Sequence, residues 1–222
     1  MTPPETPADP PRRKLTGAIV PALAAAGLAG LATLFVVGRP SDGDATARAP
    51  AGCVLDHLER FGGPINLLDV NGRRVTQGDF SSGPSVVYFG FTHCPDVCPT
   101  TLYALSRALA APDGYDIQAL MISLDPARDT PQAMRAYVAT DGFPAGLQGL
   151  TGSASQVRAA AEAFHVAYRR APSDDPNNYN VDHSSLLYVM DAQWRPRAVL
   201  SSPGQTPEAI AACISAALAR PS

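Results

Sequence analysis

The sequence predicts an α/β domain with parallel strands at its centre, and three observations support this fold class. The run Ser85–Phe91 is short, apolar and rich in β-branched and aromatic residues, which is typical of a buried strand. A helical pattern follows it, and a second apolar strand, Ile117–Leu124, is again followed by a helical pattern. Strands that alternate with helices lie parallel in one sheet and connect through right-handed crossovers.

Turn and cap residues mark the other elements of this part of the chain. Ile65–Val70 and Arg73–Thr76 flank Asn71-Gly72, a dipeptide that strongly favours a two-residue hairpin turn. Thr130 is a good N-cap, and Pro131 suits the first helical position, where its missing N–H has no partner to lose. The predicted helices are Pro99–Ala111, Pro131–Thr140, Ser153–Phe164 and Pro207–Ala219.

The C-terminal part is expected to add strands to the same sheet. Val166–Tyr168 is short and extended, and Pro172–Asn180 is a polar loop. Ser184–Met190 is a strand whose hairpin partner is Arg197–Ser201, and this hairpin should run antiparallel to the central strands. The whole order, from the first hairpin to the last helix, is that of a thioredoxin-like fold with an added N-terminal β-hairpin.

The N-terminal region predicts a single transmembrane helix ahead of the domain. Residues 1–14 are polar, expected to be disordered, and end in a basic cluster; residues 15–38 are apolar and uncharged. At a rise of about 1.5 Å per residue, this run spans a bilayer core. Residues 39–52 form a linker, and residues 53–222 form the folded domain. Because basic residues stay in the cytoplasm, we expect an inner-membrane anchor with the C-terminal domain facing the periplasm or another extracytoplasmic space.

The sequence leaves open two forms of the protein in which the N-terminal segment is cleaved off. Ala45-Thr46-Ala47 has the small residues of a cleavage site, and Ala51-Gly52-Cys53 resembles the end of a lipoprotein box. Both lie far from the apolar run, so an uncleaved anchor is the prediction.

The formal net charge of −3, with acidic and basic residues interspersed, gives no nucleic-acid-binding surface.

Chemistry is expected at Cys94 and Cys98, between the strand Ser85–Phe91 and the helix that begins at Pro99. A helix N-terminus carries partial positive charge and free N–H groups, which favour a thiolate over a thiol. Two sulfurs four residues apart can converge there on one redox partner or one soft metal ion. The alternative is two buried structural cysteines, which the exposure of a strand-to-helix loop disfavours.

His183 is the third residue of this candidate site. Ligands of open α/β sheets gather at the carboxyl ends of the parallel strands, where the two cysteines lie. If the strand Ser184–Met190 runs antiparallel beside Ser85–Phe91, its first residue lies at the edge of the sheet where the cysteines are, and His183 comes directly before it. Two thiolates and one imidazole suit Cu(I) in a trigonal site, or Cu(II) with an added ligand. Since a structural zinc site usually takes four protein ligands, copper is the predicted ion at Cys94, Cys98 and His183.

Two other functions would use the same sulfurs. A thiol–disulfide oxidoreductase would cycle Cys94 and Cys98 between dithiol and disulfide, although such enzymes usually have two residues between the cysteines and this chain has three. A peroxiredoxin-like peroxidase is suggested by Val97–Thr100, but that class needs neither Cys94 nor His183. Copper binding is favoured, and a reductase activity that would make the chain an enzyme stays open.

Other residues near these motifs are expected in supporting roles. His93 adjoins Cys94 and is a possible ligand, but it is expected to point away from the sulfurs. Asp182 either orients His183 or is a solvated turn residue. Tyr179 is a candidate partner contact. A structural ion pair is expected among Asp125, Arg128 and Asp129, and core positions for Met121, Met134 and Met190.

Cys53 and Cys213 lie outside the candidate metal site. Cys53 begins the folded domain and Cys213 lies in its last helix, and domain ends are often close together, so a disulfide between them is predicted. The alternative is a small buried Cys213 with a free or lipidated Cys53.

Four motifs occur along the domain: Phe89–Thr101, Leu124–Pro131, Gly149–Gly152 and Val181–Ser184. Together they resemble the Sco/SenC copper proteins, chaperones for cytochrome c oxidase assembly, from about Ile65 to the C-terminus. The resemblance implies a thioredoxin fold, copper held by Cys94, Cys98 and His183, and copper delivery to the binuclear copper centre of cytochrome c oxidase subunit II. It also leaves open a reductase that acts on that subunit's cysteines, with periplasmic copper carriers or thiol reductants as further partners.

Overall fold

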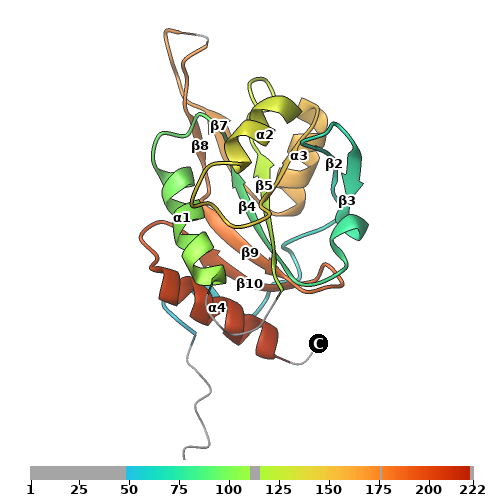
Figure 1. Ribbon diagram of the computed structural model, residues 1–222, viewed down its shortest axis with the longest axis vertical. Helices are drawn as coiled ribbons and strands as arrows, with labels where there is room; N and C mark the ends of the chain where they lie inside the picture. The colour runs from blue at the N-terminus through green and yellow to red at the C-terminus, as the bar shows by residue number, and fades with distance from the viewer. Residues whose placement is uncertain (1–48, 111–115, 176, 221–222) are drawn as a thin grey trace, which may run out of the picture. The chain divides into compact units, whose positions relative to one another are not determined.

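The computed structural model describes residues 49–110, 116–175 and 177–220 of the chain (Figure 1). By its internal contacts, Asp44–Ser222 is one compact unit. Within the described ranges, no helix is long and apolar enough to cross a membrane. The predicted segment 1–14, the predicted anchor 15–38 and most of the linker 39–52 lie outside these ranges, so the anchor stays a prediction.

A mixed sheet of eight strands lies at the centre of the described residues. Its strands are β1 (Cys53–Val54), β2 (Asn66–Asp69), β3 (Arg74–Thr76), β4 (Ser85–Gly90), β5 (Gln118–Ser123), β6 (Gln148–Thr151), β9 (Leu186–Met190) and β10 (Pro196–Ser201). Their order is β1-β10-β9-β4-β5-β6-β2-β3, with β4, β5 and β6 parallel and the other pairs antiparallel. Two further strands, β7 (Tyr168–Arg170) and β8 (Val181–His183), form a separate hairpin.

This order confirms the predicted thioredoxin-like fold with an added N-terminal hairpin. β4 is buried along its whole length, as its apolar sequence predicts. The predicted C-terminal hairpin, β9 and β10, joins β4 in antiparallel pairing. The added hairpin, β2 and β3, turns at Gly72, whose φ of 75° lies in the left-handed region that glycine adopts without strain.

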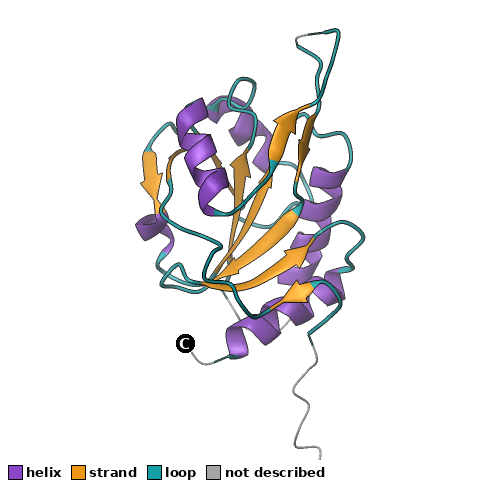
Figure 2. Cartoon of the chain, turned by 180° about the vertical axis from the view of Figure 1, so that it is seen from behind, coloured by secondary structure: helices purple, strands orange, loops and turns teal. Residues whose placement is uncertain are grey.

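Helices cover both faces of the sheet. They are the short 3-10 helix η1 (Gln77–Phe80) and the α-helices α1 (Val97–Leu109), α2 (Pro131–Val138), α3 (Ala154–Ala163) and α4 (Pro207–Ala219). Figure 2 shows α3 on the face opposite to that covered by α1 and α4. Leu102 and Leu105 of α1 and Val157 and Ala161 of α3 are fully buried, so each helix contributes an apolar face to the core.

β6 is a central strand that the sequence pattern does not predict. It has only four residues, and Gly149 interrupts its apolar run. A Cβ atom at Gly149 would lie 3.0 Å from Val138 Cγ1 and 3.2 Å from Met134 Cε, so glycine allows α2 to pack closely on β6. The same residue therefore weakens the strand pattern in the sequence and makes the packing possible.

Several element boundaries differ from the sequence-based prediction by one or more residues, and the two described here belong to elements beside the site. α1 begins at Val97 with Asp96 as its N-cap, not at Pro99. Pro99 is tolerated because it still lies in the first turn, where N–H groups have no intrahelical acceptor. The predicted extended stretch, Val166–Tyr168, ends where β7 begins. The strand continues to Arg170 because these residues pair with β8 on the other side of the polar loop.

A disulfide joins Cys53 of β1 to Cys213 of α4, with the two Cα atoms 5.8 Å apart. The predicted pairing is confirmed, and the alternative of a free or lipidated Cys53 does not apply to this structure. Cys94 and Cys98 carry the free thiols of the described residues.

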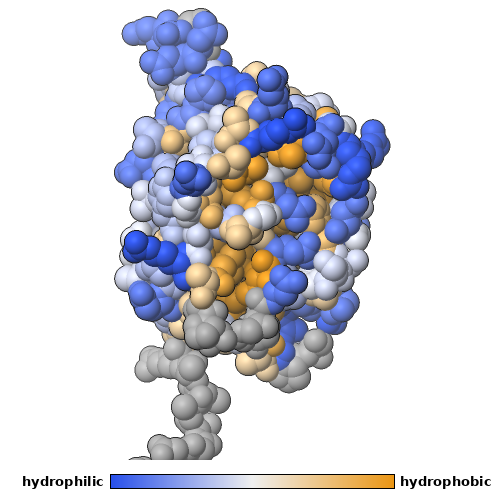
Figure 3. Space-filling model, in the orientation of Figure 1, coloured by the Kyte–Doolittle hydropathy of each residue, from blue (hydrophilic) through white to orange (hydrophobic). Residues whose placement is uncertain are grey.

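Aromatic side chains fill the gap between α1 and α2. The ring of Phe143, in the loop after α2, packs against Tyr103 of α1 and Tyr137 of α2, with centroid distances of 5.1 and 5.3 Å. Tyr103 stays 44% exposed. Figure 3 shows apolar side chains gathered between these helices on the face seen in Figure 1.

Candidate metal centre

The cysteine loop connects the end of β4 to the start of α1, at the carboxyl ends of the parallel strands. Cys94 is partly buried in the loop, and Cys98 is fully buried as the second residue of α1. The backbone N–H of Cys98 donates to Cys94 Sγ at 3.3 Å. The Cys94 sulfur thus takes one of the free N–H groups of the first helical turn, which favours its thiolate.

Gly90, the last residue of β4, leaves room for the buried sulfur. A Cβ atom there would lie 3.0 Å from Cys98 Sγ and 2.9 Å from Tyr88 Cε1. Any side chain at position 90 would therefore force the sulfur or the phenol ring to move.

His183 faces the cysteines from the end of β8. Its Nε2 lies 3.8 Å from Cys98 Sγ, across 85 positions of the chain. Its Nδ1 lies 3.0 Å from the carbonyl oxygen of Ser184. A carbonyl can only accept, so Nδ1 carries a hydrogen, and in the neutral ring Nε2 has a lone pair that faces the sulfur. The rings of Tyr88 and Phe91 meet the imidazole edge to face at 6.4 and 6.0 Å.

The two thiols have opposite acidities. The hydrogen bond with Cys98 and a smaller contribution from His183 together lower the pKa of Cys94 to about 4, against the opposing effect of burial. The same interaction with Cys94, together with burial, raises the pKa of Cys98. In the metal-free site the pair therefore holds one negative charge, on the more exposed sulfur.

A buried carboxylate fixes the start of the cysteine loop. Asp129 is fully buried, and it accepts from the backbone N–H of Thr92 at 3.1 Å and from its hydroxyl at 2.6 Å. The Ser123 hydroxyl donates to the same carboxylate at 2.6 Å. Burial raises the pKa of Asp129, and these three hydrogen bonds oppose that effect. The predicted ion pair forms between Arg128 and Asp125, whereas Asp129 holds the cysteine loop through these hydrogen bonds.

The other sequence candidates lie outside the trio. The ring of His93 is half exposed and contacts Thr92 and Asp129, with Nδ1 at 3.0 and 3.9 Å from their oxygens. Asp182 is exposed and pairs with Arg169 at 2.8 Å. The three methionines lie in the core, as expected: Met121, Met134 and Met190.

Tyr88 is a residue of the site that the sequence reading placed only in a buried strand. Its hydroxyl is buried without a hydrogen-bond partner of good geometry. Burial raises the pKa of Tyr88, and its interactions with the neighbouring Cys98 and Cys94 raise it further. Strand periodicity could have placed Tyr88 at the site. Tyr88 and Gly90 are two positions apart, so they lie on the same face of β4.

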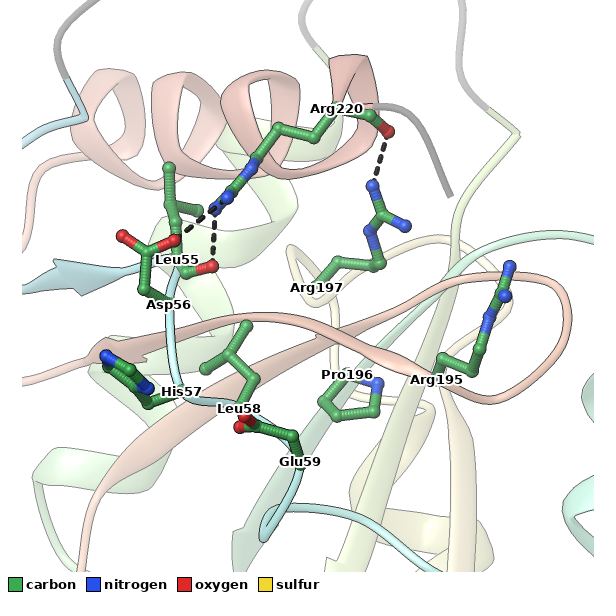
Figure 4. Close-up of a pocket in the computed structure, with 9 residues that line it drawn as sticks. All are labelled: Leu55, Asp56, His57, Leu58, Glu59, Arg195, Pro196, Arg197 and Arg220. Atoms are coloured by element: carbon green, nitrogen blue, oxygen red, sulfur yellow. Dashed lines mark hydrogen bonds and ion pairs between the residues drawn. The ribbon is translucent and has the colours of Figure 1, made fainter.

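A pocket of about 480 Å³ lies at the opposite edge of the sheet (Figure 4). It is lined in part by Pro196, which pairs with Met190, and Met190 pairs with Ser85 at the start of β4. The guanidinium of Arg220 is bound to Asp56 at 2.8 Å and to the Leu55 carbonyl. Its three arginines are paired with carboxylates and its lining has no cysteine, so this pocket is not part of the metal site.

The fold and the site define a thioredoxin-like protein with two cysteines, separated by three residues, and a histidine brought to them by a separate hairpin. The model of the SCO1/SenC family matches residues 55–219, and the chain belongs to this family. The predicted family resemblance is confirmed.

Curated relatives match the same region. Protein SCO2, mitochondrial, of Saccharomyces cerevisiae is 41% identical over 137 residues, which are 60% of this chain and 45% of that protein. A SCO2-like protein of Rickettsia prowazekii is 37% identical over 139 residues, 61% of this chain and 67% of that protein. The match to the yeast relative therefore spans less than half of its length.

Solved structures of the family share the fold. The crystal structure of Arabidopsis thaliana ScoI with copper bound has a TM-score of 0.66 and 32% identity, covering 71% of this chain and 98% of that one. Bradyrhizobium japonicum ScoI with copper bound has a TM-score of 0.61 and 36% identity, covering 70% and 98%. Both of these similar proteins carry copper.

Proposed function

We propose that this chain is a copper-binding metallochaperone that delivers copper to the binuclear copper centre of cytochrome c oxidase subunit II. The observation that carries the proposal is the approach of His183 Nε2 to Cys98 Sγ at 3.8 Å, at the helix end that also holds Cys94. Family membership and the copper carried by similar solved structures support the same function.

The donor set fits the cargo. Two sulfurs and one neutral imidazole are soft or intermediate ligands and suit Cu(I). With bonds of roughly 2.3 Å to sulfur and 2.1 Å to nitrogen, two trigonal ligands lie about 3.8 Å apart, which is the separation of Cys98 Sγ and His183 Nε2. Among the described residues, no three such side chains are already closed around one point, so we expect copper to draw the partly buried Cys94 inward.

The unequal burial of the sulfurs suggests the route of delivery. Cys94 is the more exposed and the more acidic thiol, and Cys98 is fully buried. A sulfur of the acceptor would therefore add to copper from the side of Cys94, and Cys94 would leave first, while Cys98 and His183 still hold the ion. We propose that this happens at the periplasmic side of the inner membrane, where the predicted anchor 15–38 would hold the domain.

A second candidate function is a thiol–disulfide reductase that keeps the cysteines of subunit II reduced. It is favoured by the lowered pKa of Cys94, because the thiolate is the attacking species in disulfide exchange. Cys94 would attack the substrate disulfide, and Cys98 would then release the reduced substrate as the Cys94–Cys98 disulfide forms. The two electrons come from the dithiol, which a periplasmic thiol reductant would restore.

Copper titration of the reduced chain tests the proposal. We expect one copper per chain, with sulfur and nitrogen donors in X-ray absorption spectra, and loss of tight binding in the Cys94→Ser/Cys98→Ser variant. The matched control is Cys53→Ala/Cys213→Ala, which removes the other two cysteines and should bind copper normally. Equally tight, stoichiometric binding by the Cys94→Ser/Cys98→Ser variant would rule the site out. Appearance of the binuclear copper absorption in metal-free subunit II, mixed with the loaded chain, would test delivery.

A further inference from the structure

The hairpin that carries His183 is separate from the main sheet. His183 is the last residue of β8 and pairs with Tyr168 of β7. Figure 1 shows the two strands above α1 in that view. An isolated two-stranded hairpin is only marginally stable, so the place of His183 depends on what holds β7 and β8 against the rest of the domain.

Tyr179, two residues before β8, connects this hairpin to the loop between β5 and α2. Its hydroxyl donates to Asp125 Oδ1 at 2.7 Å. Its ring lies between two guanidinium groups, with Arg128 Cζ at 3.6 Å and Arg170 Cζ at 3.7 Å from the ring centroid. Arg170 ends β7, and Arg128 and Asp125 belong to the β5–α2 loop. The Tyr179 ring therefore bridges the hairpin and this loop.

The β5–α2 loop is itself firmly fixed. The Asp125 side chain is 5% exposed and forms an ion pair with the Arg128 guanidinium. The Asp125 N–H donates to the Ser123 hydroxyl at 3.0 Å. Arg128 also donates to the carbonyl oxygen of Asn177, in the loop between β7 and β8, at 3.3 Å. The hairpin thus has a second contact with the same loop, also through Arg128.

The same loop also holds the cysteine segment. Asp129 of this loop accepts the two hydrogen bonds from Thr92, two residues before Cys94. One rigid segment, Asp125–Asp129, is therefore bound on one side to the start of the cysteine loop and on the other side to the hairpin that ends at His183.

We propose that Tyr179 is a positioning residue for His183. Held between Arg128 and Arg170 with its hydroxyl on Asp125, it fixes β7 and β8 so that the imidazole stays within reach of Cys98. The part of this proposal that concerns metal retention rests on the proposed copper function, whereas the part that concerns the hairpin does not.

Hydrogen exchange of the metal-free full chain tests the hairpin. The backbone N–H of Ser184 donates to the Ala167 carbonyl at 2.9 Å and reports whether the hairpin is closed. We expect Tyr179→Leu to speed exchange in the peptide around Ser184 at least tenfold, and Tyr179→Phe, which keeps the ring, to speed it less. The control is Tyr103→Leu, at a partly exposed tyrosine on α1, which should leave this peptide unchanged.

Copper competition tests whether Tyr179 acts through His183. Loss of a residue that orients a metal ligand typically weakens binding by roughly 10–100-fold, and we expect about tenfold for Tyr179→Leu. In the His183→Ala background the same change should cause no further loss, because the ligand that it positions is gone. The Tyr103→Leu control should bind copper as the wild type does.

The outcomes are distinct. Unchanged Ser184 exchange in Tyr179→Leu would overturn the proposal, and so would an equal copper loss with and without His183. If the wild-type chain binds no copper, the proposed function fails, and the exchange comparison alone decides whether Tyr179 holds the hairpin.

Discussion

His183 Nε2 and Cys98 Sγ lie 3.8 Å apart, although His183 ends a strand of the separate hairpin, Cys98 lies in α1, and the two residues are 85 positions apart in the chain. The separation depends on two features. Antiparallel pairing of β9 with β4 brings the chain before β9 to the carboxyl edge, and the β7–β8 hairpin turns His183 toward the sulfur.

The first prediction separates metal binding from redox chemistry at this pair. His183→Ala should weaken copper binding because the imidazole is one of three ligands, and should leave the thiols able to form a disulfide because imidazole supplies no electrons. A copper competition assay beside a thiol redox titration measures both. A large change in thiol potential with unchanged copper affinity would favour the reductase function instead.

The second prediction concerns the pH dependence of Cys94. Its pKa is lowered to about 4, so the thiolate persists as the pH falls and is protonated only as the pH passes below that value. The alkylation rate of Cys94 in the reduced, metal-free chain should therefore stay nearly constant from pH 8 to pH 5 and then fall. Buried Cys98, whose pKa is raised, should react far more slowly.

Iodoacetamide labelling with peptide mapping measures this profile. An ordinary thiol loses about tenfold in rate for each pH unit below its pKa of about 8.5. A fall of that size for Cys94 between pH 8 and pH 6 would show that the helix end does not stabilise its thiolate.

The third prediction concerns the Cys53–Cys213 disulfide. Removing a native disulfide that closes so long a loop typically costs about 2–5 kcal/mol of unfolding free energy. Cys53→Ala/Cys213→Ala should therefore unfold at lower denaturant concentration than the wild type and still bind one copper. Non-reducing peptide mapping should recover the two cysteines in one linked peptide pair, and recovery of both as free thiols would contradict the bond.

The fourth prediction concerns the membrane anchor. The uncharged run 15–38 behind Arg12, Arg13 and Lys14 should remain in the mature chain and leave the C-terminus outside the cytoplasm. Reporters that are active in only one compartment, fused after Ser222, measure the orientation. A mature N-terminus beyond Gly38, found by mass spectrometry, would show that the anchor is cleaved.

Much of the fold follows from the sequence because its signals are local. The apolar run of β4, the Asn71-Gly72 turn and the Thr130 cap each determine their own element, and the structure has all three. β6 could not be predicted, because Gly149 breaks its apolar pattern, and the reason for this glycine is a close contact with α2 that appears only in the folded chain. Local patterns do not contain such information.

The site likewise contains residues that the sequence predicts and residues that it does not. The spacing of Cys94 and Cys98 predicts the two sulfur ligands, and the position of His183 before a predicted strand predicts the third ligand. The Asp129 bonds to Thr92 and the Tyr179 contact with Asp125 join segments 37 and 54 positions apart, and no sequence period links them. Only the folded chain shows which ordinary Asp and Tyr residues support the site.

The Cys53–Cys213 bond turns most of the domain into a covalent ring. Cys94, Cys98 and His183 all lie within the 160 positions that the ring encloses. A single cut by a protease anywhere in the ring would leave both pieces joined, with every candidate ligand still on one molecule. Separation of the cysteines from the histidine after such a cut would require reduction of the bond as well.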